Sequence, residues 1–109
     1  MMLWEIRQYQ KRNGEIPFKE WLLGLNDSQT RARVRARLDR LRLGNFGDSK
    51  SVGSGIFELR FHLGPGYRVY YGLRQGRIVI LLSGGDKSAQ ASDIRKANVY
   101  WQDYLERET

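Results

Sequence analysis

Ionisable side chains alternate along residues 56–63 in a pattern that could build a phosphate-binding surface. Glu58, Arg60 and His62 occupy every second position, and Arg68 and Tyr70 repeat this spacing after a short turn. Because successive side chains of a β-strand point to opposite faces of its sheet, all five are predicted to share one face. Guanidinium groups donate paired hydrogen bonds to phosphate oxygens, and a tyrosine ring can stack on a nucleobase. The alternative is a solvated face on which Glu58 pairs with an arginine.

A second candidate phosphate contact lies in the segment Ser83–Ser88, where two adjacent glycines precede Lys87. Backbone amides beside glycine can approach a phosphate closely, and Lys87 adds a positive charge. The complete phosphate-loop motif of nucleotide triphosphatases is absent, so a plain turn between a strand and a helix is the alternative. Lys50, in a segment rich in glycine and serine, has the same two interpretations. No metal or cofactor is predicted, because the aspartates do not recur at a metal-binding interval.

The first elements that must support these residues follow from the periodicity of the apolar side chains. Alternation predicts a strand over Leu3–Tyr9. Pro17, a favoured first residue of helices, then opens a short amphipathic helix. Asp27 or Ser28 can cap a second helix, which is rich in arginine and ends before Gly44.

The second half of the chain is predicted to form most of the sheet. Residues 45–55 read as a loop because turn-forming residues cluster there. Residues 56–63 and 67–73 form a β-hairpin, and the continuously apolar residues 78–82 form a strand buried inside the sheet. A last helix covers residues 89–108. The predicted fold is α+β, in the order β-α-α-β-β-β-α, with a small, mainly antiparallel sheet packed by helices.

Length and composition limit the classes of protein to be considered. The 109 residues fit one domain, so residues 1–109 are treated as a single unit. The chain has no cysteine, which excludes thiol catalysis, cysteine-ligated zinc and a disulfide scaffold, and His62 is its one histidine. With no apolar run of about 18–20 residues and no charged-then-apolar leader, a soluble cytoplasmic protein is expected.

The net charge of +7 is concentrated in the middle of the chain, where residues 27–85 carry eleven basic and four acidic side chains. This distribution favours a polyanion or an acidic protein as the partner. The arginines of the second predicted helix fall on both flanks of its apolar stripe. Their long stems are therefore expected to cover apolar flanks as general surface, and specific binding of nucleic acid by this helix is the alternative.

Four segments resemble, in their order and spacing, the RelE/ParE toxin superfamily, and in particular its phage-derived HigB-like branch of addiction module killer proteins. The Glu-Leu-Arg and Tyr-Arg-Val sequences on successive strands are typical of this superfamily. The likeness extends over nearly the whole chain and implies a RelE-like fold. The segments that carry it are Leu43–Lys50, Ile56–Arg60, Tyr67–Tyr71 and Leu81–Ser88.

The resemblance implies a toxin of a type II toxin–antitoxin system that binds and cleaves mRNA on the ribosome as a metal-free endoribonuclease. In related toxins the ribose 2′-hydroxyl attacks the neighbouring phosphate, leaving a cyclic phosphate and a free 5′-hydroxyl. A cognate antitoxin of the helix-turn-helix, HigA-like kind is the implied partner. The superfamily also contains poisons of DNA gyrase, so a ParE-like gyrase inhibitor is one alternative, and a catalytically inactive antitoxin-binding module is another.

The resemblance also implies catalytic roles for residues that match the family's motifs. Arg60 and Arg68 correspond to its strand arginines, which bind phosphate and stabilise the charge of the transition state. Lys87 lies where relatives carry a basic or acid–base residue. Glu58 or His62 is the expected general base, His62 because of its intrinsic pKa near neutrality and Glu58 because of its motif. The choice between them stays open.

The general acid and the remaining RNA contacts have a weaker correspondence to the family. Relatives carry a carboxy-terminal histidine or tyrosine acid that has no clear counterpart in this sequence. Tyr70, Tyr71 or Lys87 is therefore the expected substitute. Lys50, Tyr70 and Tyr71 are expected to contact RNA.

Overall fold

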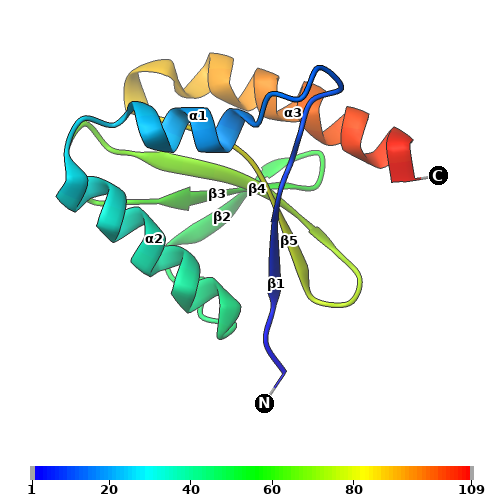
Figure 1. Cartoon of the computed structure of the whole chain (residues 1–109), viewed down its shortest axis with the longest axis horizontal. Coiled ribbons are helices and arrows are strands. Elements are labelled where there is room, and N and C mark those ends of the chain that lie inside the picture. Colours follow the sequence, from blue (N-terminus) through cyan, green and yellow to red (C-terminus); the bar gives the residue numbers. More distant parts are fainter. Residues whose placement is uncertain (1, 109) are drawn as a thin grey trace.

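The computed structural model describes residues 2–108, which form a five-stranded sheet with helices packed on both faces (Figure 1). The strands are β1 (Glu5–Gln8), β2 (Ser49–Gly53), β3 (Ile56–Arg60), β4 (Arg68–Arg74) and β5 (Ile78–Gly85). The helices are α1 (Pro17–Gly24), α2 (Ser28–Arg42), the short 3-10 helix η1 (Lys87–Ala89) and α3 (Gln90–Glu108). The predicted α+β class is confirmed.

The strands lie in the order β1-β5-β4-β3-β2. β1 runs parallel to β5, whereas β2, β3, β4 and β5 form a continuous antiparallel series. The sheet is thus mainly antiparallel, as predicted. The apolar strand predicted over residues 78–82 lies in the interior of the sheet, since β5 has neighbours on both sides.

Two apolar cores, one on each face of the sheet, hold the helices in place. Alternation along the strands sends neighbouring side chains to opposite cores, so Tyr70 and Tyr71 belong to different ones. The first core packs α1 and α2 on the sheet and includes Phe18, Leu22, Val34, Leu41, Leu59, Val69 and Leu81. The second packs α3 on the opposite face and includes Ile56, Ile80, Leu82, Ala97 and Trp101.

Both amino-terminal helices begin where their sequences predict. Pro17 occupies the first turn of α1, where its missing N–H has no intrahelical partner to lose. Asp27 caps α2, since its Oδ1 accepts a hydrogen bond from the backbone N–H of Gln29 at 3.0 Å. Val34 and Leu41, on the predicted apolar stripe of α2, are fully buried.

The prediction of a loop over residues 45–55 is wrong, because Ser49–Gly53 forms the edge strand β2. Its sequence has no alternating apolar residues, and all five of its residues are exposed or half-buried. Backbone pairing with β3 therefore defines this strand. Its first residue, Ser49, lies opposite Leu59 of β3. The turn to β3 uses positive φ values at Ser54 and Gly55, of 56° and 82°.

The glycine loop predicted after residue 82 is also partly wrong, because β5 continues to Gly85. These glycines accommodate close packing. A Cβ at Gly84 would lie 2.2 Å from the Trp21 ring, and one at Gly85 would lie 1.9 Å from Oδ2 of Asp93. The strand therefore passes beneath α1 and α3 at positions that admit no side chain.

Candidate functional site

The register of β3 and β4 confirms the predicted shared face of the hairpin except at His62, which lies beyond the end of β3 because that strand stops at Arg60 and not at residue 63. Glu58 lies opposite Tyr70, and Arg60 lies opposite Arg68. This face is not a solvated outer surface, however, because α3 packs on it and both Glu58 and Tyr70 are 0% exposed. The inner end of the face is therefore buried, and its outer end is open.

Glu58 is surrounded by polar groups beneath the start of α3. Its Oε2 accepts a hydrogen bond at 2.8 Å from Nε2 of Gln90 and lies 3.8 Å from Nε of Arg68. Burial, and next the charge of Glu58, raise the pKa of Tyr70 above that of a free phenol. The buried Glu58 carboxylate thus forms an ion pair with Arg68, whose side chain lines an open depression at the surface.

Arg60, His62, Arg68 and Lys87 line one open pocket of about 540 Å³, here called the basic pocket. Its wall is completed by the β3–β4 turn, including Gly64 and Gly66. Lys87 reaches it because η1 lies against this turn, where a Cβ at Gly66 would be 3.3 Å from Cβ of Lys87. Four of the five predicted catalytic residues therefore meet in one place. Glu58 is not part of the wall.

Asp48 is a site residue that the sequence did not reveal. Its Oδ1 accepts hydrogen bonds from Nε and Nη2 of Arg60, at 3.0 and 2.7 Å, and its Oδ2 lies 2.5 Å from Nε2 of His62. Arg60 and then His62 hold the pKa of the Asp48 carboxyl below its ordinary value. The carboxylate thereby fixes two side chains of the basic pocket.

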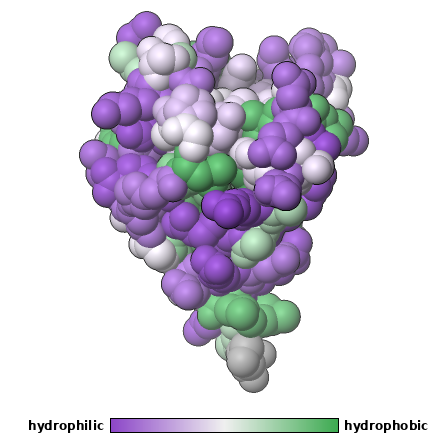
Figure 2. Space-filling view, turned by 90° about the vertical axis from the view of Figure 1, so that its left-hand side faces the viewer, coloured by the Kyte–Doolittle hydropathy of each residue, from purple (hydrophilic) through white to green (hydrophobic). Residues whose placement is uncertain are grey.

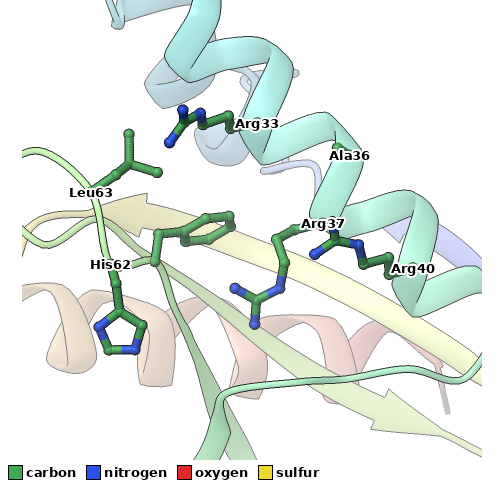
Figure 3. A pocket seen from close by; sticks show the side chains of 7 residues that line it. Arg33, Ala36, Arg37, Arg40, His62 and Leu63 are labelled. Carbon is green, nitrogen blue, oxygen red and sulfur yellow. The ribbon is translucent and has the colours of Figure 1, made fainter.

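The arginines of α2 line a second hollow of about 310 Å³ (Figure 3). This α2 hollow is formed by Arg33, Ala36, Arg37 and Arg40 together with residues 61–63. Residues 61–63 also line the basic pocket, so the two depressions share one wall. Figure 2 shows the side of the molecule on which the amino end of α2 lies. The surface on this side is polar over most of its area.

Arg37 has a structural role within this hollow. It donates a hydrogen bond from Nη1 to the carbonyl oxygen of Arg60 at 2.8 Å, and its guanidinium lies 5.0 Å from the ring centroid of Phe61. Burial lowers its pKa. Arg37 therefore ties α2 to the end of β3. The sequence signal for this hollow is the spacing of Arg33, Arg37 and Arg40, which are four and three residues apart and therefore share one face of the helix.

The three residues expected to contact RNA do not join the basic pocket. Lys50 lies on the edge strand β2 and lines a separate hollow of about 350 Å³ with Tyr71 and Phe57. Tyr71 is 1% exposed, and its hydroxyl bonds to that of Ser49. Since Tyr70 is also buried, neither ring is available for base stacking in this conformation.

Two further properties concern metal ions and membranes. Within residues 2–108, no group of three or more His, Asp or Glu side chains is arranged to hold a metal ion. None of the helices in this range is both long and apolar enough to cross a membrane.

Comparison with known proteins gives matches over most of the chain. Residues 20–100 match the family model described as "Phage derived protein Gp49-like (DUF891)". An uncharacterized protein of Haemophilus influenzae is 50% identical over 88 residues, which cover 81% of this chain and 89% of that protein. A mutant of the E. coli toxin RelE in the free state has the same fold, with a TM-score of 0.62 and 21% identity over 90% of this chain and 96% of RelE. The chain therefore belongs to the phage-derived Gp49-like family and has a RelE-like fold.

Proposed function

We propose that this protein is the toxin of a type II toxin–antitoxin system and acts as an endoribonuclease on mRNA at the ribosome. The observation that carries the proposal is the basic pocket. The side chains of Arg60, Arg68, Lys87 and His62 all line this one depression. Cations grouped around one open site suit a phosphodiester whose negative charge increases in the transition state. The RelE-like fold and the Gp49-like family support the same conclusion.

In the proposed reaction, the ribose 2′-hydroxyl attacks the adjacent phosphate while His62 removes its proton. The bond from phosphorus to the 5′-oxygen breaks, which yields a cyclic phosphate and a 5′-hydroxyl. Arg60 and Arg68 stabilise the extra charge on the phosphoryl oxygens, and Lys87 donates the proton that the leaving oxygen takes up. His62 is favoured over Glu58 as the base because its side chain is 80% exposed at the pocket, whereas that of Glu58 is buried.

Nε2 of His62 is engaged by Asp48, so Nδ1 is the nitrogen available to the substrate. A carboxylate on one imidazole nitrogen stabilises the protonated ring that forms when the other nitrogen accepts a proton. Asp48 therefore acts through His62 and Arg60 as a positioning residue.

Primer extension on cellular mRNA after induced expression tests this function. New 5′ ends in translated messages, lost in the Arg68→Ala variant, are the expected result. Arg74→Ala is the matched control, because Arg74 lies on the same strand but pairs with Glu108 at 2.6 Å, outside the basic pocket. Growth arrest without new 5′ ends, accompanied by DNA breaks in a plasmid cleavage assay, would instead identify a gyrase inhibitor.

The proposed partner is an antitoxin, of the HigA-like helix-turn-helix kind, that neutralises the toxin in the cytoplasm. Co-expression of the adjacent open reading frame should restore growth, and the two proteins should co-purify. Continued arrest in the presence of a stable neighbouring protein would exclude that protein as the antitoxin.

A further inference from the structure

The α2 hollow offers charges that nothing else in the described chain neutralises. Arg33 and Arg40 are exposed, and neither makes a hydrogen bond or ion pair with another side chain within residues 2–108. Their situation differs from that of Arg37, which donates to backbone carbonyls. Figure 3 shows Arg33 and Arg40 one on each side of Arg37 along α2. Two guanidinium groups are therefore free to bind an anion from solution.

The position of these charges connects them to the basic pocket. His62 and its two neighbours form the wall that both depressions share, and Lys87 stands on the far side of that wall. A ligand that crosses residues 61–63 can thus contact Arg33 and Arg40 at one end and Lys87 at the other. Such a ligand must be extended and carry several negative charges, as a nucleic-acid strand does.

The chemistry of the α2 hollow fits phosphates better than nucleobases. Its one aromatic side chain, Phe61, is 4% exposed and is covered by the guanidinium of Arg37. A base would find no open aromatic face there on which to stack. Contacts of arginine side chains with phosphates fix the position of a strand and carry little sequence information.

We propose that Arg33 and Arg40 form a second phosphate subsite, which holds the RNA strand beyond the nucleotides bound in the basic pocket. This inference rests on the proposed function. It adds that the bound RNA extends from the basic pocket across residues 61–63 to the α2 hollow. The RNA recognised is a single strand longer than the segment at the cleavage point, and its outer part is bound without regard to base sequence.

Fluorescence anisotropy with 2′-O-methyl RNA tests the subsite without cleavage, because the attacking hydroxyl is blocked. A trinucleotide and a nonanucleotide are compared on the wild type, on Arg33→Ala/Arg40→Ala, and on Arg35→Ala/Arg42→Ala. The last variant removes the same charge from exposed positions of α2 that do not line the hollow. Circular dichroism confirms that all three proteins are folded.

The expected result is that Arg33→Ala/Arg40→Ala weakens binding of the nonanucleotide and leaves the trinucleotide unchanged. Loss of two phosphate contacts should reduce the magnitude of the salt slope of log K by about 1.4 for a single strand. The control variant should bind both RNAs nearly as the wild type does. If both double variants lose the same affinity for the nonanucleotide, the loss reflects net charge alone, and the subsite is overturned.

Two other results separate the possible failures. A wild type that binds the nonanucleotide, with no change in Arg33→Ala/Arg40→Ala, overturns the subsite and leaves the proposed function standing. A wild type that binds neither free RNA overturns the subsite, whereas the proposed function, which acts at the ribosome, is decided separately by primer extension. Ribosome pelleting measures binding of each variant to ribosomes. If Arg33→Ala/Arg40→Ala loses only ribosome binding, these arginines contact ribosomal RNA, and their assignment to the substrate strand is overturned.

Discussion

Asp48 holds the guanidinium of Arg60 through a single carboxylate oxygen, Oδ1, which lies 3.0 Å from Nε and 2.7 Å from Nη2. A guanidinium has five N–H donors, so both hydrogens of Nη1 and one of Nη2 stay available to a ligand. The other oxygen of Asp48 contacts His62. One carboxylate thus orients a phosphate-binding group and an acid–base group without using up either.

Replacement of Asp48 by asparagine should lower the melting temperature at neutral pH and have less effect in acid. The pKa of Asp48 is depressed in the folded protein, chiefly by Arg60. Its ionised form therefore stabilises the fold fully above the unfolded pKa of about 3.9, and this stabilisation is lost as the pH falls through the lower folded value. Melting curves of both proteins from neutral pH to below pH 3 measure the difference. Asp39→Asn, which removes the same charge at an exposed site, is the control, and its melting temperature should change less than that of Asp48→Asn.

Glu58→Ala should destabilise the protein by about 3 kcal/mol, as measured by urea denaturation. The substitution leaves the 13%-exposed Arg68 side chain without its carboxylate and deprives Gln90 of its acceptor. Glu58→Gln keeps an acceptor oxygen for Gln90 and should cost less. A double-mutant cycle with Arg68→Ala measures the coupling between the two side chains. Additive effects would show that Glu58 does not support Arg68.

Gly72→Ala should loosen the contact between the sheet and α3. A Cβ at Gly72 would lie 2.5 Å from the Trp101 ring, which is itself 4% exposed and cannot move into open space. Overpacking of this kind costs about 1–3 kcal/mol of the free energy of unfolding. Trp101→Leu should restore part of the loss in the double variant. Gly24→Ala, where a Cβ meets no atom within 4 Å, is the control and should not destabilise the protein.

Arg68→Ala should lower the rate of mRNA cleavage by about 10²–10³-fold in a purified translation mixture, the usual effect of removing one transition-state hydrogen-bond donor. Arg68→Lys keeps the charge but loses the paired donors, so it should recover only part of the rate. The rate constant at saturating mRNA separates this effect from weaker binding. Cleavage at the wild-type rate by Arg68→Ala would remove Arg68 from the catalytic site.

Sequence periodicity predicted the hairpin and its shared face because alternation is a local property of a strand. Glu58, Arg60, Arg68 and Tyr70 lie on that face as predicted. Their exposure was not predictable in the same way, since it depends on α3, whose first residue Gln90 covers Glu58 from far along the chain. The expected surface for stacking on Tyr70 is for this reason part of a core.

Asp48 and β2 were missed for a related reason. The segment around Asp48 has neither apolar alternation nor helical spacing, and backbone pairing with β3 defines its structure. Asp48 directly precedes β2 and contacts Arg60 at the end of the neighbouring strand β3, so the contact becomes visible only when the register of β2 and β3 is known. The glycines of β5 were misread because glycine permits both a turn and close packing, and Trp21 decides between them at Gly84.

The pairing of the first strand with the last one has a consequence for synthesis of the protein. Glu5 pairs with Ile78 and Gln8 with Leu81, so β1 has no strand partner until β5 has left the ribosome. A contact this distant in sequence closes late and slows folding. The strand at one edge of the sheet is thus synthesised well before its partner, and a chain that ends before β5 has no strand with which β1 can pair.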